Sequence, residues 1–255
     1  MRPADNWQLK IVRLKNKGMN LATEFIDSIF QLFYPKSCAC CGTPLIENEH
    51  SICLYCILDL PYTDFHLYIS NSLARQFWGI IELDAAAACF HFNKGGKVQH
   101  LLHQVKYKHN QNAAYFIGEL YGNILSKNKT FNEIELIVPV PIHAKKEKIR
   151  GYNQAERFAS GLASSLKKPV LSKVLFRENQ GVSQTFKNRE ERYQSLSGQF
   201  SLSTDLKYLS LLSNCKVLLV DDVITSGSTL VHCAKLLQSK NCQVSIAAIA
   251  YTGTG

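Results

Sequence analysis

The sequence has no apolar stretch long enough to span a membrane and no secretory leader. Its longest largely apolar stretches, such as LDAAAACF at 83–90, stop well short of the about 20 residues that a transmembrane helix needs. The basic amino-terminal stretch MRPADNWQLKIVRLKNKG lacks the apolar core and small-residue cleavage site of a signal peptide. We therefore expect no membrane span and a protein that stays in the cytoplasm.

Two common nucleotide-binding signatures are also missing. The chain contains neither GxxxxGK followed by Ser or Thr nor GxGxxG after an apolar strand, which argues against a nucleoside triphosphate loop and a dinucleotide-binding loop. It has no internal repeat and no low-complexity tract. Apolar residues make up 46% of 255 residues, which is enough to build the core of a globular α/β domain with a small appendage.

The positive charge is concentrated at the amino terminus. The formal net charge is +9, and residues 1–18 carry five basic side chains against one acidic side chain. A basic balance is compatible with nucleic acid, a phosphorylated ligand or an anionic membrane surface, and does not choose among them. We interpret residues 1–18 as a basic extension, and translation from Met19 in place of Met1 as an alternative that would leave it out.

Residues 19–35 predict an amphipathic helix that ends at Pro35. The apolar side chains near a 3.6-residue period are Leu21, Phe25, Ile29, Leu32 and Phe33. We interpret the stripe as a packing surface, with a membrane-surface or partner-binding role as the alternative.

Two Cys-x-x-Cys pairs predict a metal site. Cys38 and Cys41 form the first pair, Cys53 and Cys56 the second, with eleven residues between the pairs. In a cytosolic chain of this size, such cysteines favour metal ligation over disulfides, and two such turns present four thiolates to one tetrahedral zinc ion. Gly42 gives the first turn its backbone freedom. The alternative is a set of unliganded buried cysteines.

The predicted zinc is structural. Four protein ligands leave no open coordination position, so the ion should fold the module and do no chemistry. Cys40 and His50 lie close enough in the sequence to compete for the ion, and we expect both to be spectators.

From about residue 80 the pattern becomes an alternation of strands and helices. The expected strands are AAAACFHF (85–92), IELIVPVP (134–141), the short PVLSKVLF (169–176), KVLLV (216–220) and CQVSIAAIAYT (242–252). The expected helices cover 97–107, about 112–126, 153–166 and 229–239, and 177–200 is expected to be a long polar loop. Apolar strands separated by helices predict an α/β fold with a parallel sheet covered on both faces. The predicted domains are 19–62, a helix plus zinc ribbon, and 80–255, the α/β domain.

The stretch VLLVDDVITSGSTL at 217–230 predicts a ligand site. A buried strand ending at Val220 delivers Asp221 and Asp222 to the carboxyl edge of the sheet, where open α/β sheets bind ligands. The turn into the next helix consists of Thr225, Ser226, Gly227, Ser228 and Thr229. Its amide and hydroxyl groups can surround an anion, while the carboxylates suit sugar hydroxyls, so a ribose 5-phosphate fits both halves. The alternative is an Asp-rich turn followed by an ordinary helix cap.

This segment resembles the phosphoribosyl pyrophosphate motif of type I phosphoribosyltransferases: four apolar positions, two acids, two apolar positions and a Thr/Ser/Gly loop. Together with the cysteine pairs, HLLHQVKYKHN and VPVPIHAKKEKIRGYNQAERFA, it resembles the ComF family of competence-associated phosphoribosyltransferase-like proteins over about residues 21–251. The residues that match family positions are Arg150, Gly151, Tyr152, Asn153, Gln154, Lys106, Tyr107, Gln184, Arg189 and Arg192. Lys187, Ser195 and Ser226 depart from the usual residues.

The resemblance implies basic residues that hold a pyrophosphate group. Arg150, Arg189, Arg192 and Lys106 are the expected binding residues. Further lysines at 145, 146 and 148 either join this clamp or form a solvated basic face. Mg²⁺ bound with phosphoribosyl pyrophosphate would be held mainly by ligand oxygens.

The resemblance also implies a role in DNA uptake during natural competence. The expected partners are phosphoribosyl pyrophosphate or a ribose 5-phosphate ligand, single-stranded DNA and a competence helicase, with Tyr107 and Tyr152 as stacking aromatics. One alternative is a phosphoribosyltransferase enzyme that displaces pyrophosphate at C1 of the ribose, although the sequence identifies no acceptor pocket. Another is a non-catalytic regulator that senses the same ligand.

Overall fold

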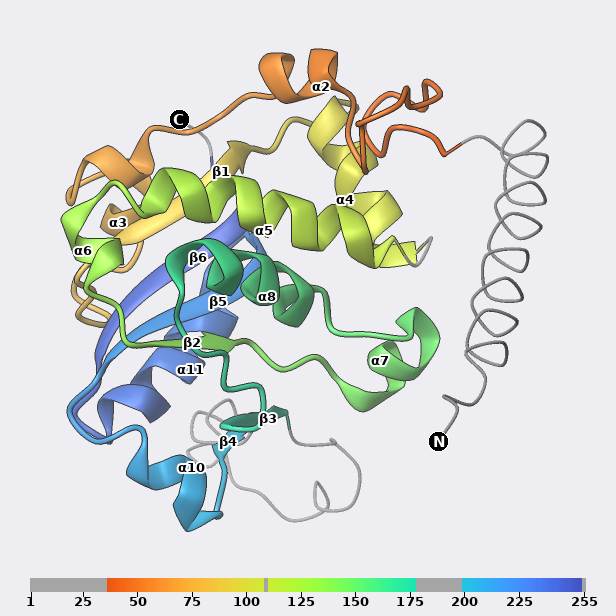
Figure 1. Cartoon of the computed structure of the whole chain (residues 1–255). Helices are drawn as coiled ribbons and strands as arrows, with labels where there is room; N and C mark the ends of the chain where they lie inside the picture. The colour runs from red at the N-terminus through yellow and green to blue at the C-terminus, as the bar shows by residue number, and fades with distance from the viewer. Residues whose placement is uncertain (1–35, 108–109, 178–198, 254–255) are drawn as a thin grey trace, which may run out of the picture.

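The computed structural model describes residues 36–107, 110–177 and 199–253 (Figure 1). The helices are α2 (Leu54–Asp59), η1 (Phe65–Leu67), α3 (Ser72–Arg75), α4 (Lys97–Tyr107), α5 (Gln111–Leu125), α6 (Lys129–Asn132), α7 (Ala144–Arg150), α8 (Gln154–Leu166), α10 (Leu206–Ser210) and α11 (Ser228–Gln238). The strands are β1 (Ala86–His91), β2 (Leu136–Pro139), β3 (Leu175–Arg177), β4 (Phe200–Leu202), β5 (Lys216–Ile224) and β6 (Gln243–Tyr251). The expected extension 1–18 and the amphipathic stretch 19–35 lie outside the described residues.

Four strands form a parallel sheet in the order β1-β6-β5-β2, which confirms the predicted sheet. The continuous apolar character of these strands fits their position, because the sheet is covered on both faces. The short strand expected at 169–176 is confirmed only in part. Val170 bridges Ile137 of β2 in parallel, with backbone hydrogen bonds from Ile137 N to the Pro169 carbonyl and from Leu171 N to the Ile137 carbonyl. The second half is wrong as a member of this sheet, because β3 pairs with β4 in a separate antiparallel ribbon.

The predicted end of the strand at Val220 is also wrong. β5 continues to Ile224, and Asp221 pairs with Ala248 of β6. The physical reason is β6, which runs to Tyr251 and offers backbone partners beyond the apolar run of β5. The two aspartates therefore stand on a regular strand, which fixes their positions more firmly than a turn does.

Side chains from alternating strand positions enter two hydrophobic cores on opposite faces of the sheet. Leu218 and Val220 pack with α5 and α8, whereas Val217 and Leu219 pack with α11. Figure 1 shows α5 and α8 in front of the sheet and α11 behind it.

The cysteine-rich segment joins the first of these cores. Cys38, Ile52 and Cys56 are buried in one cluster with side chains of α4 and α5. On the opposite face, Phe65 and Phe77 from the segment between the two predicted domains pack against the sheet with α11. The predicted domain boundaries at 62 and 80 stay a prediction. The cysteine-rich segment nevertheless packs in the same hydrophobic core as helices of the predicted α/β domain.

Within the described residues, no helix combines the length and the apolar character needed to cross a bilayer.

Candidate functional site

A pair of carboxylates and a lysine meet at the carboxyl edge of the sheet. The Lys106 Nζ atom at the end of α4 lies 3.0 Å from Oδ2 of Asp222, and the two side chains are only 24% and 18% exposed. An ion pair this sheltered from water is screened less by salt than a surface pair. Lys106 therefore keeps a fixed positive charge beside the acids, although it is 116 residues away from Asp222 in the sequence.

Asp221 lies on the same strand and is half-buried. Its Oδ1 atom accepts a hydrogen bond from the backbone N–H of Asp222 at 2.8 Å. Burial, and then the neighbouring charge of Asp222, raise the pKa of Asp221 well above its ordinary value, against the opposing influence of that N–H and of Lys106. A carboxyl group with a raised pKa at a ligand cavity is typical of functional sites.

The loop after β5 has the geometry of an anion cradle. Residues 225–229, together with Asp221, line a small cavity of about 30 Å³. Gly227 precedes α11 with a left-handed backbone (φ +71°) and has no side chain to cap the helix, so it leaves the first N–H groups of α11 without a side-chain cap. This is the arrangement by which a helix start binds a phosphate group.

A second, distant segment holds this loop in place. The Gln76 Nε2 atom donates a hydrogen bond to the Thr225 carbonyl at 2.8 Å, and the ring of Phe77 lies against Gly227. Neither contact was predicted from the sequence, because no local pattern joins residues that are 149 positions apart.

A larger cavity of about 210 Å³ adjoins the cradle through shared lining residues, among them Asp221 and Thr229. Its charged lining residues are Lys106, Lys146, Arg150, Arg177, Asp221 and Asp222. Four cations against two acids make this cavity suitable for a ligand that carries several negative charges.

Arg177 is a cavity residue that was not predicted from the sequence. It ends β3, and its guanidinium carbon lies 5.2 Å from the centre of the Phe200 ring on β4. The sequence signal that could have identified Arg177 is a basic residue where the predicted short strand joins the predicted polar loop.

The RGYNQ element at 150–154 turns the chain between α7 and α8 beside the same cavity. Gly151 ends α7 in the left-handed region (φ 76°), and the Asn153 side chain accepts from Ala155 N at the start of α8. Asn153 Nδ2 also donates to the Val140 carbonyl at 3.0 Å. Arg150 Nη1 donates to Gln154 Oε1 at 2.8 Å, so these contacts hold the guanidinium at the cavity wall.

Tyr152 and Tyr107 differ in exposure, which corrects one expectation. Tyr152 is 7% exposed and its hydroxyl donates to the Val105 carbonyl, so it is a packing residue. The prediction that its ring stacks on a base is therefore wrong. Tyr107 is 58% exposed, with the Arg150 guanidinium carbon 5.4 Å from the centre of its ring.

The basic stretch after β2 forms the short helix α7. No residue of α7 is buried, and Lys146 and Arg150 line the larger cavity, whereas Lys145 and Lys148 do not. Arg189 and Arg192, with Gln184, lie outside the described residues.

The four predicted metal ligands come together in space. The sulfur atoms of Cys38, Cys41, Cys53 and Cys56 all lie within 4.8 Å of one another. Thiolates on one tetrahedral zinc ion stand about 3.8 Å apart, as follows from a Zn–S bond of about 2.3 Å, and Cys41 and Cys53 are already at 3.8 Å. The backbone N–H groups of Cys40 and Cys53 lie 3.4 and 3.3 Å from the Cys38 sulfur, and Gly42 has a φ of 77°. The site can bind a metal such as zinc.

The predicted spectators are separate from this cluster. Within the part of the chain that the structure describes, neither Cys40 nor His50 belongs to the cluster, and burial raises the pKa of the Cys40 thiol. By contrast, hydrogen bonding to Thr43 lowers the pKa of Cys41 to about 6, which favours its thiolate, the form that binds metals.

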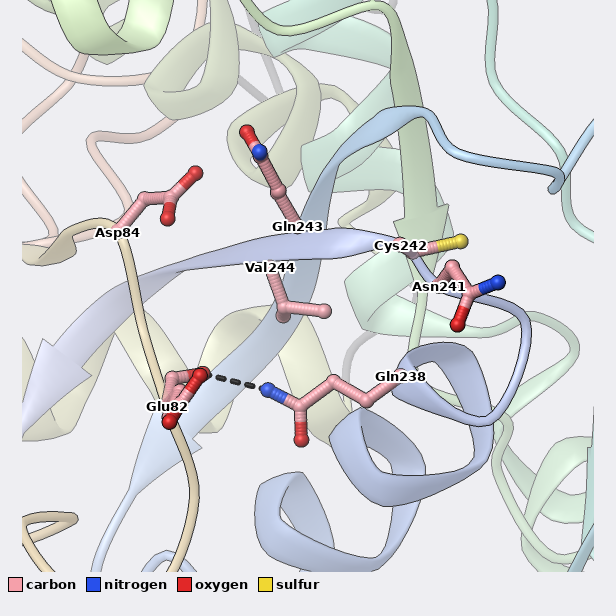
Figure 2. A pocket seen from close by; sticks show the side chains of 7 residues that line it. All are labelled: Glu82, Asp84, Gln238, Asn241, Cys242, Gln243 and Val244. Carbon is pink, nitrogen blue, oxygen red and sulfur yellow. Dashed lines mark hydrogen bonds between the residues drawn. The ribbon is translucent and has the colours of Figure 1, made fainter.

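Another cavity, of about 320 Å³, lies at the amino end of the sheet (Figure 2). It is lined by Glu82, Asp84, Gln238, Asn241, Cys242, Gln243 and Val244. Its charged side chains are two carboxylates, which repel a phosphate, and the Gln238 amide already donates a hydrogen bond to the Glu82 carbonyl. This cavity therefore does not suit a phosphate.

Comparison with known proteins finds similarity over part of the chain. Residues 152–255 match the phosphoribosyl transferase domain family. Over 104 residues the chain is 36% identical to competence protein F of Haemophilus influenzae, a match that covers 41% of this chain and 44% of that protein. The match therefore spans less than half the length of this curated relative.

Two solved structures show weak similarity to the chain, in both sequence identity and TM-score. The allosteric regulatory enzyme of purine biosynthesis has 20% identity and a TM-score of 0.34 over 52% of this chain and 25% of its own. A hypoxanthine phosphoribosyltransferase from Staphylococcus aureus has 18% identity and a TM-score of 0.33 over 54% of this chain and 62% of its own. Similarities this weak identify no ligand. The sequence matches, in contrast, show that residues 152–255 are similar to the phosphoribosyl transferase domain family and that part of the chain is similar to competence protein F.

Proposed function

We propose that the chain binds phosphoribosyl pyrophosphate, or another ribose 5-phosphate ligand, at the carboxyl edge of β5. The observation that carries the proposal is the meeting of two cavities around Asp221 and Thr229, one lined by the helix start and one by four cations. Each half suits a different part of the same ligand.

The 5-phosphate is assigned to residues 225–229, because their amides and hydroxyls offer hydrogen bonds to an anion. Asp221 and Asp222 accept hydrogen bonds from the ribose hydroxyls. The pyrophosphate group is assigned to Arg150, Arg177 and the two cavity lysines.

A divalent ion accompanies this ligand in the proposal. Mg²⁺ would neutralise pyrophosphate oxygens and would be held mainly by the ligand. Lys106 forms an ion pair with Asp222, so a ligand that binds Asp222 must share or replace that contact.

The test is isothermal titration calorimetry with phosphoribosyl pyrophosphate and Mg²⁺. The paired change Asp221→Asn with Asp222→Asn should weaken binding by at least about 100-fold, since hydrogen bonds to charged groups contribute about 1.5–3 kcal/mol each. The matched control is Glu82→Gln, which removes an exposed carboxylate at the other end of the sheet. Equal affinity in the paired variant and the control contradicts the site.

Catalysis is measured separately from binding. If the bound ligand is also turned over, pyrophosphate is released when a nucleophilic base is added. A panel of bases with wild-type protein and the paired aspartate variant distinguishes an enzyme from a ligand-binding regulator.

We also propose that the four-cysteine cluster holds a structural zinc ion. Its support is the sulfur spacing and a ligand set of four thiolates, which zinc prefers in closed sites.

A second candidate function is binding of single-stranded DNA, favoured by the exposed basic helix α7 beside Tyr107. The name of the related competence protein F is consistent with this function. Lysines on α7 can contact phosphates, and an exposed aromatic ring can stack on a base.

The salt dependence of oligonucleotide binding tests this candidate. Lys145→Gln with Lys148→Gln removes two exposed charges from α7 and should reduce the slope of log affinity against log salt by about 1.4. Lys235→Gln with Lys240→Gln, two exposed lysines on and just after α11, should leave the slope unchanged. Equal slopes for the two pairs would exclude α7 as the contact.

A further inference from the structure

The segment that carries the four cysteines and α2, residues 36–62, exposes a group of large apolar side chains; we call this segment the zinc module. Ile46, Leu54, Tyr55 and Leu58 are 73%, 61%, 69% and 77% exposed, and we call them the α2 patch. Scattered exposed apolar residues are normal, but a contiguous patch with a polar rim marks an interaction surface.

The contacts of Glu49 show that the α2 patch is continuous. The Glu49 carboxylate accepts hydrogen bonds from the backbone N–H groups of Ile46 (3.1 Å) and Leu54 (2.7 Å), which brings the knuckle loop beside the start of α2. Leu54 and Leu58 are four residues apart on this helix and so lie on one face. The opposite face carries the buried Cys56.

A polar rim borders the patch at Tyr55. The Lys97 ammonium lies 4.5 Å from the centre of the Tyr55 ring and 2.6 Å from the Asp59 carboxylate. These contacts fix the Tyr55 ring against α4 and leave Leu54, Leu58 and Ile46 as the uncovered apolar surface.

The first described residue, Lys36, lies beside this surface, so the preceding segment joins the described part of the chain here. The carbonyl of Lys36 accepts a hydrogen bond from Leu45 N at 2.8 Å, and Leu45 adjoins Ile46. Lys36 and Ile46 also line one cavity of about 500 Å³. Phe33 is three residues from Lys36, so its Cα lies within about 11 Å of this point.

We propose that the amphipathic stretch 21–33 packs on the α2 patch, and that this intramolecular contact completes the apolar core of the zinc module. Its apolar side chains recur on one face, and a helix over these 13 residues would be about 20 Å long, enough to extend from Ile46 along α2. In the proposed helix, Pro35 would mark the end, next to the anchoring point at Lys36.

The short tether is the reason to choose this occupant over a separate molecule. A segment joined by two residues to the edge of the patch has an effective concentration in the millimolar range, far above that of a second copy or another protein. The proposal does not depend on the ligand proposed for the carboxyl-edge site.

The test is cleavage of the native full-length chain by chymotrypsin within residues 21–34, where aromatic and leucine side chains provide sites. The cleavage rate reports the population in which the segment is undocked. Leu58→Glu places a charge in the patch and should accelerate cleavage by at least 10-fold. The matched control is Leu206→Glu on α10, because Leu206 is 79% exposed and far from the patch in sequence.

Phe25→Glu tests the other side of the contact and leaves the described body unchanged. It should accelerate cleavage at the remaining sites to the same extent, and the combination with Leu58→Glu should add little. The rate in the wild type should not depend on protein concentration; protection that grows with concentration would assign the patch to a second copy. Rapid cleavage in the wild type, or equal rates for Leu58→Glu and Leu206→Glu, would overturn the proposal.

Discussion

The chemistry of the carboxyl-edge site depends on the protonation of Asp221. Burial and the charge of Asp222 raise its pKa well above the ordinary value of 3.8. Because its pKa is higher in the folded protein than in the unfolded chain, the ionised form of Asp221 is disfavoured by folding. The free energy of unfolding should therefore fall as the pH rises from about the unfolded pKa through the folded pKa.

The same shift predicts that ligand binding releases a proton. A Mg²⁺ ion or a sugar hydroxyl interacts better with a carboxylate than with a carboxylic acid, so the affinity for Mg²⁺–phosphoribosyl pyrophosphate should rise with pH until Asp221 is ionised. The rise should be up to about tenfold per pH unit below the folded pKa. Calorimetry in buffers of different ionisation enthalpy counts the protons, and Asp221→Asn should abolish the release from this group. Proton uptake in place of release, or an unchanged count in Asp221→Asn, would contradict this role.

Among the structural elements, the connection from β5 to α11 determines the shape of the anion cradle. Gly227 has a φ of +71°, and a Cβ atom there would lie 2.7 Å from two ring atoms of Phe77. The conformation and the close approach both require glycine, because an L-residue is strained in this region and the ring is buried.

Gly227→Ala should therefore lower both stability and ligand affinity. The left-handed backbone costs about 1–2 kcal/mol for a residue with a Cβ, and the contact with Phe77 adds about 1–3 kcal/mol of overpacking. Gly95→Ala is the matched control, since Gly95 has a φ of +78° but a Cβ atom there would meet nothing within 4 Å. Thermal unfolding should show a larger loss for Gly227→Ala, and Phe77→Leu in the same chain should recover part of it. Equal losses at the two glycines would remove Phe77 from the explanation.

Local patterns in the sequence predicted much of this element and of its neighbours. The apolar run at 217–220 predicted the buried strand, and the Thr/Ser/Gly loop predicted the turn into α11. The extension of β5 to Ile224 was missed because strand length depends on the partner: β6 provides pairing opposite Asp221, Val223 and Ile224. Likewise, the RGYNQ element was found by resemblance, but only the structure separates the buried Tyr152 from the cavity residue Arg150.

At the scale of the whole molecule, the parts that could not be predicted are contacts between distant segments. The spacing of the four cysteines was sufficient to predict that their sulfur atoms come together, since two short turns determine where the thiolates point. The Lys106–Asp222 ion pair, the hydrogen bond from Gln76 to Thr225 and the antiparallel β3–β4 pair each join residues with no shared local pattern. They follow from tertiary packing, which periodicity does not describe.

That packing also connects the four-cysteine module with the side of the molecule that carries the proposed ligand site. Cys38 and Cys56 are buried in the same hydrophobic core as Leu101 and Val105 of α4, and α4 ends with Lys106 and its ion pair to Asp222. Loss of the metal should therefore reach beyond the module.

Cys53→Ser should remove the metal and lower the thermal stability of the whole chain. Native mass spectrometry should find one zinc ion per wild-type chain and none in the variant, because three thiolates and a weakly ligating hydroxyl do not complete the site. Since the module shares a core with α4 and α5, the melting temperature of the main transition should fall by at least about 5 °C, as expected for a loss of a few kcal/mol in a chain of this size. Cys40→Ser is the matched control, a buried cysteine of the same module outside the ligand cluster, and it should keep the zinc ion. An unchanged main transition in zinc-free Cys53→Ser would mean that the module and the α/β domain are energetically independent despite their common core.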